Sequence, residues 1–207
     1  MTQTYTADWF DRHAPNWNRW LADFKGRPGL RALEIGSYEG RSAVWLLQNV
    51  LTDPSCVIEC ADLFDGDYLA NFRANTAPWS GQVVEHHGRS FDALRTAQGP
   101  FDIVYIDGSH WAPDVLTDAL MAWPLLKAGG VMIFDDYNWL SPEMEAQEPG
   151  PVMLWLMRTV GYHWRRASIR QAGPRTPKLA VDCLLKVLEG RYELLGLEYQ
   201  VAVRKLR

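Results

Sequence analysis

The sequence predicts an α/β fold, an open, doubly wound and mostly parallel sheet built by a single domain. Short apolar runs alternate with helical patterns, glycine turns separate them, and no linker or repeat divides the 207 residues. Strands that alternate with helices form βαβ units, whose parallel sheet is covered by helices on both faces. A hydrophobic content of 47% supports a sizeable core and excludes a disordered chain or a collagen-like repeat.

We expect residues 1–28 to form a helical cap that precedes the sheet. Four large apolar side chains recur at helical spacing within residues 16–25: Trp17, Trp20, Leu21 and Phe24. Asn16 follows a proline and is the expected N-cap. Such a stripe is typical of a helix that packs on a core, and the same aromatic face could also form a homodimer contact.

Five strands and four helices alternate after the cap. We expect the strands at residues 31–35, 57–61, 82–85, 101–106 and 131–134. We expect the helices at residues 41–51, 68–74, 91–97 and 112–126. Gly129-Gly130 is expected to be the break before the fifth strand.

The alternation stops after Asp136. Residues 137–176 contain prolines and tryptophans with one expected helix at 152–160, and this excursion is too long for an ordinary connection. It begins where the fifth strand ends, so it is expected to be a lid or substrate loop, with a solvated insert as the alternative. A helix at 178–188 and strands at 192–195 and 200–206 complete the chain, and this terminal hairpin leaves its last strand antiparallel.

Charge and cysteine content narrow the function classes. The formal charge of -4 and the pI of about 5.7 provide no basic surface for nucleic acid or anionic membranes, so a small-molecule ligand is favoured. Cys56, Cys60 and Cys183 form neither an even disulfide set nor a metal-type pair, and we expect all three to be buried. No signal peptide or membrane span is apparent, so a cytoplasmic protein is predicted.

Ligands of open α/β sheets bind at the carboxyl ends of the strands, where the strand order reverses. The run Glu-Ile-Gly-Ser-Tyr-Glu-Gly-Arg-Ser at residues 34–42 follows the first strand, and Gly36 and Gly40 allow the backbone to approach a ligand closely. Asp62 follows the second strand, where a carboxylate can accept hydrogen bonds from both hydroxyls of a ribose. Together these two sites predict an adenosine ligand.

The loop favours S-adenosylmethionine over a dinucleotide. The third glycine of a dinucleotide loop is missing, and acidic Glu39 inside the loop is expected to repel two phosphates. The sulfonium and amino groups of S-adenosylmethionine suit the acidic residues Glu34 and Asp62. A nicotinamide-dependent oxidoreductase stays open as an alternative.

Carboxylates also follow the fourth and fifth strands, at Asp107 and at Asp135-Asp136. These strands should be neighbours about 4.8 Å apart, so their terminal carboxylates can converge on one divalent cation such as magnesium. Adjacent strand residues point to opposite faces, so both aspartates of the pair could bind the ion only where the chain leaves the sheet. Solvated acidic turns are the alternative.

Taken together, residues 32–42, Asp62, residues 107–110 and residues 129–137 resemble class I S-adenosylmethionine-dependent methyltransferases. Within these the chain is similar to metal-dependent O-methyltransferases of the catechol O-methyltransferase type and to bacterial natural-product relatives that act on sugars. The resemblance covers about Leu30 to Arg207. It implies a Rossmann-like sheet of seven strands that the terminal hairpin completes.

The resemblance also implies roles for individual residues. Cofactor contacts are implied for Glu34, Gly36, Ser37, Tyr38, Gly40, Ser42, Asp62, Arg89, Ser90 and Asp107, and metal ligands for Asp107, Asp135 and Asp136. His110 stands where the catechol enzymes have a catalytic lysine, and its ordinary pKa of about 6.5 suits a general base. A histidine that only donates to a metal-binding carboxylate is the alternative. Trp111 and Trp139 are expected beside the acceptor, whereas His86-His87 and the cluster of His163 with Arg165-Arg166 are expected to be surface residues.

These expectations define a reaction in which a metal-bound hydroxyl of a natural product, sugar or phenol is methylated and His110 removes its proton. A repurposed, non-catalytic protein that binds S-adenosylmethionine is the second alternative.

Overall fold

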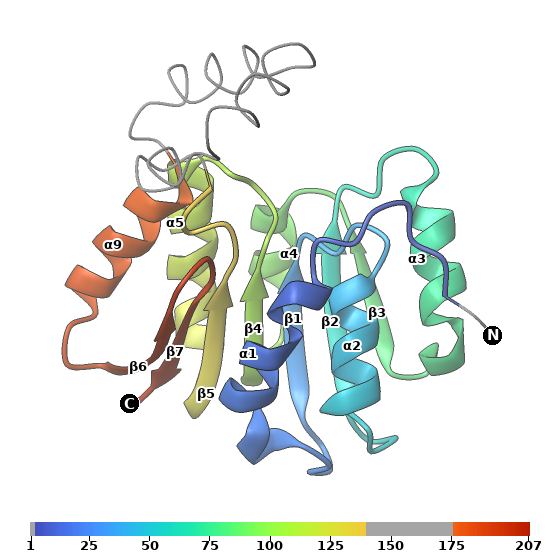
Figure 1. The fold of residues 1–207 in the computed structure, drawn as a ribbon, viewed down its shortest axis with the longest axis horizontal. Coiled ribbons are helices and arrows are strands. Elements are labelled where there is room, and N and C mark those ends of the chain that lie inside the picture. The colour runs from blue at the N-terminus through green and yellow to red at the C-terminus, as the bar shows by residue number, and fades with distance from the viewer. Residues whose placement is uncertain (1–2, 140–175) are drawn as a thin grey trace, which may run out of the picture.

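The computed structural model describes residues 3–139 and 176–207 and shows a seven-stranded sheet between two layers of helices (Figure 1). The strand order is β3-β2-β1-β4-β5-β7-β6. Strands β1 to β5 run parallel, and β7 is antiparallel to both β5 and β6. The predicted fold class and the antiparallel last strand are therefore confirmed.

The strands are β1 (Arg31–Ile35), β2 (Val57–Asp62), β3 (Val83–His87), β4 (Phe101–Ile106), β5 (Leu126–Phe134), β6 (Tyr192–Leu197) and β7 (Val201–Lys205). The prediction for Gly129-Gly130 was wrong, because both glycines lie inside β5. The pairing of β4 with β5 shifts register between Phe101 and Ile103, and Gly129 takes a φ of +80°. This irregularity lets one strand continue through the two glycines.

The described helices are α1 (Ala14–Trp20), α2 (Arg41–Asn49), α3 (Tyr68–Thr76), α4 (Ser90–Thr96), α5 (Ala112–Ala122) and α9 (Pro177–Val187). Four 3-10 turns accompany them: η1 (Asp11–His13), η2 (Ala22–Phe24), η3 (Ala77–Trp79) and η4 (Trp123–Leu125). Asn16 lies inside α1 and is not its N-cap, because Pro15 occupies the first turn, where its missing N–H costs nothing. Helix α5 ends at Ala122 and continues into η4, because Pro124 lacks the N–H that the next α-helical hydrogen bond would need.

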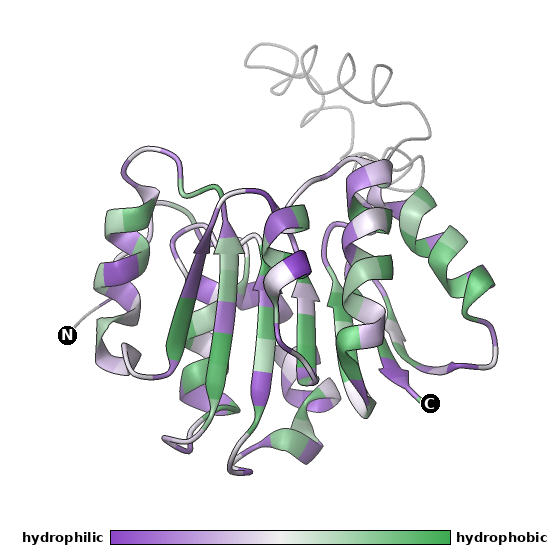
Figure 2. Ribbon diagram, turned by 180° about the vertical axis from the view of Figure 1, so that it is seen from behind, coloured by the Kyte–Doolittle hydropathy of each residue, from purple (hydrophilic) through white to green (hydrophobic). Residues whose placement is uncertain are grey.

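Each face of the sheet packs against its own group of helices. Aromatic and aliphatic side chains of α1, α2 and α3 cover one face, with Trp17 fully buried. Helices α4, α5 and α9 cover the other face, where Val104, Met132 and Val203 belong to the same cluster. The strands are largely hydrophobic (Figure 2), as burial on both faces requires.

The structure tests the expectation for the cysteines, whereas the expectations for the excursion concern residues that it does not describe. Cys56 and Cys60 are buried, but Cys183 is exposed on α9, so the prediction that all three are buried was wrong. Residues 140–175, which make up most of the expected excursion at 137–176, lie outside the described part of the chain. The helix expected at 152–160 and the cluster of His163 with Arg165-Arg166 fall within them. Across the described residues, none of the helices combines the length and the apolar character that a membrane crossing needs.

Candidate active site

The strand order reverses between β1 and β4, and the two segments that leave these strands are in direct contact. A Cβ atom on Gly36 would lie 2.1 Å from the carbonyl oxygen of Asp107. Gly36 also has a φ of +85°, a left-handed conformation that favours glycine. Glycine is therefore required here, and it brings the loop after β1 against the aspartate that follows β4.

A pocket opens at this contact. Its lining comprises Tyr5, Ala7, Trp9, Phe10, Gly36, Ser37, Tyr38, Arg41, Ser42, Tyr105, Asp107 and Asp135. The hydroxyls of Ser37 and Tyr5 are buried and have no hydrogen-bond partner within the described structure. Gly40, the N-cap of α2, provides no side-chain cap, so the helix N-terminus behind the loop can meet an anionic group. Unsatisfied buried hydroxyls beside such a terminus fit a polar ligand such as the methionine part of S-adenosylmethionine.

Glu34 lies beneath the loop and does not line the pocket. It is fully buried and accepts a 2.5 Å hydrogen bond from Ser42 Oγ, while the Cys60 thiol lies 3.7 Å from its other oxygen. Burial raises the pKa of Glu34 to about 7. Glu34 thus orients Ser42, which does line the pocket.

Asp62, at the end of β2, fastens the same loop. Its Oδ2 accepts hydrogen bonds from the backbone N–H groups of Ser37 and Tyr38, both at 2.8 Å, and its Oδ1 accepts one from Phe64. These bonds use three of the roughly four acceptor positions of a carboxylate. Arg89 and Ser90 follow β3 at the same edge of the sheet, where Arg89 is the N-cap of α4.

An N-terminal strap, residues 3–10, crosses over the pocket, and sequence reasoning did not find it. The backbone N–H of Thr4 donates to Asn75 and that of Thr6 donates to Glu39, at 2.9 and 2.6 Å. Glu39 is only 1% exposed and also accepts a bond from Asn71 at 2.8 Å. The expectation that Glu39 repels phosphates was therefore based on a wrong placement, because its carboxylate holds the strap.

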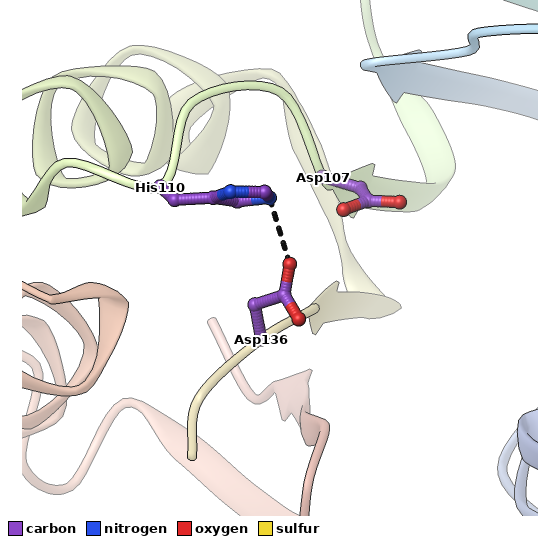
Figure 3. Close-up of side chains that lie close together, drawn as sticks. All are labelled: Asp107, His110 and Asp136. Atoms are coloured by element: carbon purple, nitrogen blue, oxygen red, sulfur yellow. Dashed lines mark ion pairs between the residues drawn. The ribbon is translucent and has the colours of Figure 1, made fainter. Parts of the chain in front are cut away.

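Asp107, His110 and Asp136 come together beside the pocket (Figure 3), with one ligand atom of each within 4.8 Å of the others. His110 Nε2 lies 2.8 Å from Asp136 Oδ2. Asp136 has a φ of +55°, which turns the chain out of the sheet immediately after β5. The sequence required such an exit if Asp135 and Asp136 were to bind one ion, but of this pair it is Asp136 that joins Asp107 and His110.

Asp135 points to different partners. Its Oδ2 accepts hydrogen bonds from the Tyr105 hydroxyl and, at 2.9 Å, from Gln200 Nε2. The Tyr105 hydroxyl also lies 2.9 Å from Asp107, so it bridges the two aspartates. Gln200 in turn accepts a bond from Trp17 at 2.8 Å. Asp135 thus adjoins Asp107 through Tyr105 and is not part of the group formed with His110.

The electrostatics of this cluster favour a cation. Burial, followed by the charge of Asp135, raises the pKa of Asp107 well above its usual range. Burial also raises the pKa of Asp135, whereas at Asp136 burial is outweighed by the hydrogen bonds from His110 and Tyr199, which lower the pKa. Because like charges in a buried site repel, a divalent cation would stabilise these carboxylates together. Carboxylate oxygens suit magnesium, calcium or manganese, whereas a histidine nitrogen suits zinc, iron, nickel or copper.

The remaining aromatic and histidine candidates lie in different surroundings. The ring of Trp139 lies 4.6 Å from that of His110, whereas Trp111 is the N-cap of α5 and is 51% exposed. His86 and His87, in β3, contact Glu59 and Glu85 respectively at 2.9 Å. The two histidines therefore contact glutamates of β2 and β3 and are not among the residues that line the pocket.

Comparisons with known proteins identify the family to which the chain belongs. A family model described as a methyltransferase domain matches residues 33–137, half of the chain. An uncharacterized protein, R132, of Acanthamoeba polyphaga mimivirus is 29% identical over 132 residues, which is 57% of this chain and 56% of that protein. The mycinamicin VI 2''-O-methyltransferase of Micromonospora griseorubida is 27% identical over 132 residues, 62% of this chain and 31% of that enzyme. The chain thus spans about half or less of these relatives' length.

Solved structures share the fold. An O-methyltransferase from Bacillus cereus in complex with SAH has a TM-score of 0.63 at 18% identity, over 97% of this chain and 84% of that chain. The MycE methyltransferase in complex with Mg and SAH has a TM-score of 0.62 at 21% identity, over 97% and 51%. The resemblance drawn from the motifs is confirmed.

Proposed function

Because the chain belongs to the family of methyltransferase domains, we propose that it transfers the methyl group of S-adenosylmethionine to a hydroxyl oxygen of a small molecule. One observation supports this most directly: Asp107 lines the pocket next to the glycine loop and also belongs to the cluster with His110 and Asp136. A methyl donor in the pocket and an acceptor at the cluster would therefore meet at one residue. Proximity of this kind is a large part of catalysis in group transfer.

For the donor, we assign the methionine part to Gly36, Ser37, Tyr38, Gly40 and Ser42. The unpartnered hydroxyl of Ser37 supports this placement. Asp62 is assigned to the ribose with its one remaining acceptor position, so it would bind one ribose hydroxyl and not both. Arg89 and Ser90 are assigned to the edge of the adenine.

For the metal, we assign Asp107 and Asp136 as two of the ligands. The third is either Asp135, as the family resemblance implies, or His110, whose ligand atom lies within 4.8 Å of those of Asp107 and Asp136. A divalent ion, most simply magnesium, lowers the pKa of a coordinated hydroxyl and orients it when bound in such a site. The Mg in the MycE complex agrees with this assignment.

Methylation of a hydroxyl releases one proton, which a base must accept. The acceptor oxygen attacks the methyl carbon, the new O–C bond forms as the S–C bond breaks, and the sulfonium becomes a neutral thioether. His110 can take the released proton, since Asp136 binds its Nε2 and leaves Nδ1 as an acceptor. The hydrogen bond that His110 donates to Asp136 raises the pKa of His110, which strengthens it as a base.

Two variants separate the roles. His110→Ala should lower turnover while leaving the affinity for S-adenosylhomocysteine and magnesium unchanged if His110 is the base. If the variant also loses magnesium, His110 is a ligand. Asp135→Asn should abolish metal-stimulated turnover under the assignment that the resemblance implies. His87→Ala, an exposed histidine in β3, is the matched control.

Calorimetric titration with S-adenosylhomocysteine, with and without magnesium, tests the proposal as a whole. Binding that magnesium strengthens, together with transfer of a labelled methyl group, is the expected result. Binding without transfer to any acceptor would indicate a non-catalytic protein, and binding of NADH instead would indicate an oxidoreductase. We also assign the enzyme to the cytoplasm and to natural-product biosynthesis. The expected homodimer contact through the aromatic face of residues 17–24 was wrong, because Trp17, Trp20, Leu21 and Phe24 are buried in the chain's own core.

A further inference from the structure

The N-terminal strap contributes four residues to the lining of the pocket that we assign to S-adenosylmethionine: Tyr5, Ala7, Trp9 and Phe10. The strap passes from α3 to α1 across the start of α2 (Figure 1). The motifs that carry the family resemblance begin after it, and the matched family model covers only residues 33–137. Neither therefore implies a role for the strap, and what it does in the site follows from its own contacts.

Two hydroxyl groups in this pocket are buried and have no hydrogen-bond partner among the described residues. One belongs to Tyr5 of the strap and the other to Ser37 of the loop after β1, which is only 2% exposed. Ser42 differs from them, because its hydroxyl already donates to Glu34 at 2.5 Å. Burial raises the pKa of Tyr5, so its hydroxyl keeps its proton at pH 7 and can donate. Because a buried donor without a partner costs free energy, both hydroxyls point to a ligand with acceptor atoms.

Arg41, in the first turn of α2, brings a positive charge to the same pocket. Its Nε lies 3.8 Å from Asp8 and its Nη2 forms an ion pair with Asp11, whereas its other terminal nitrogen, Nη1, is in neither ion pair. The guanidinium carbon also lies 5.4 Å from the centre of the Tyr5 ring. Arg41 therefore holds Tyr5 and the end of the strap against the start of α2.

The polar groups of the pocket suit a ligand that carries both signs of charge. Tyr5, Ser37, Arg41 and the uncapped N-terminus of α2 provide hydrogen-bond donors and positive charge. Asp107 and Asp135 provide carboxyl groups. An amino acid has a carboxylate and an ammonium group on one carbon, so it can satisfy both sets. A ligand without the carboxylate would leave the donors unpaired, and a simple anion would be repelled by the aspartates.

We infer that the strap recognises the carboxylate of the amino-acid part of S-adenosylmethionine, with the Tyr5 hydroxyl donating to it and Arg41 holding Tyr5 in place. The inference rests on the proposed function, since it names the end of the methyl donor that the strap binds. Tyr5 is then a specificity-determining residue and Arg41 a positioning residue. Adenosine derivatives that lack the carboxylate should bind without any contribution from the Tyr5 hydroxyl.

The test compares two nucleosides by isothermal titration calorimetry of the full chain. They are S-adenosylhomocysteine and S-adenosyl-3-thiopropylamine, which differs from it only in lacking the carboxylate. Tyr5→Phe should weaken binding of S-adenosylhomocysteine about tenfold, since a hydrogen bond to a charged group is lost, and should leave binding of the amine unchanged. Arg41→Met should also weaken S-adenosylhomocysteine. In the double variant the two effects should multiply to less than their product, because both act on one carboxylate.

Matched controls are Tyr192→Phe in β6 and Arg95→Met in α4, whose guanidinium carbon lies 5.8 Å from the ring centre of Phe91. Neither residue lines the pocket, so both variants should bind both nucleosides as the wild-type chain does. If Tyr5→Phe weakens both nucleosides equally, the strap has only a packing role, and if it weakens neither, the hydroxyl has no role. Either result would overturn the inference. Failure of the proposed function is distinguishable, because the wild-type chain would then bind neither nucleoside.

Discussion

Replacing Gly36 with alanine is the sharpest test of how the loop and the acidic site are joined. The new Cβ would lie 2.1 Å from the Asp107 carbonyl oxygen and 2.7 Å from the Cα of Gly108, both inside the 3.0 Å that real Cβ contacts respect. Each of these neighbours is backbone, so no side chain can rotate to make room. Either the loop or the end of β4 must move.

The loss of folding stability in Gly36→Ala is the sum of two free-energy costs. A left-handed backbone costs a non-glycine residue about 1–2 kcal/mol, and forcing an extra carbon into a packed site costs about 1–3 kcal/mol. Gly36→Ala should therefore reduce the free energy of unfolding by about 2–5 kcal/mol, a large part of the usual 5–15 kcal/mol. At about 2–4 °C for each kcal/mol in a chain of this size, the melting temperature should fall by roughly 4–20 °C.

Urea unfolding followed by tryptophan fluorescence measures this difference. Gly190→Ala is the control, because Gly190 has a similar φ of +77° but nothing within 4 Å of the position that a Cβ atom would take, so only the backbone term applies. We expect Gly36→Ala to be the more destabilised of the two and to lose affinity for S-adenosylhomocysteine. Equal destabilisation of the two variants would refute the steric argument.

Three further predictions concern buried groups and the strap. Burial raises the pKa of Glu34 from 4.5 to about 7, so its contribution to stability is present below pH 4.5 and is lost as the pH rises through 7. Relative to Glu34→Gln, the wild-type chain should lose about 3 kcal/mol across that window in urea titrations, and parallel pH profiles would contradict this. Tyr105→Phe should cost about 1–3 kcal/mol because two buried aspartates lose their shared donor, whereas Tyr192→Phe should be nearly neutral in the same melts. Deleting residues 1–8 should speed release of S-adenosylhomocysteine about tenfold in stopped-flow measurements, since part of the pocket wall is removed; an unchanged rate would show that the strap does not retain the ligand.

Most strands and helices could be predicted because their signals are local. The strand expected at 101–106 coincides with β4, and the end of β1 at residue 35 is marked by Gly36. Errors arose where a local signal had two meanings. The glycine pair in β5 looked like a break but forms an irregularity in the pairing, which depends on the neighbouring strand.

The placement of individual side chains in the site was less predictable. Glu39 was expected to repel the phosphates of a dinucleotide, but its carboxylate binds the strap. The sequence gives no sign of this contact, because Thr6 lies 33 residues earlier in the chain. Likewise, the partners of Asp135 come from β4 and from the turn between β6 and β7, where Gln200 lies 65 residues away.

The sequence by itself determined the alternation of strands and helices, the glycine loop after the first strand and the carboxylates at the ends of the fourth and fifth. These features follow from hydrophobic periodicity and backbone freedom, which neighbouring residues set. Only the tertiary structure decided which carboxylates face one another and which residues of the N-terminal strap line the pocket. Tyr5 and Tyr105 are far apart in the chain and line one pocket because the strap crosses the end of the sheet, and no local pattern encodes such a contact.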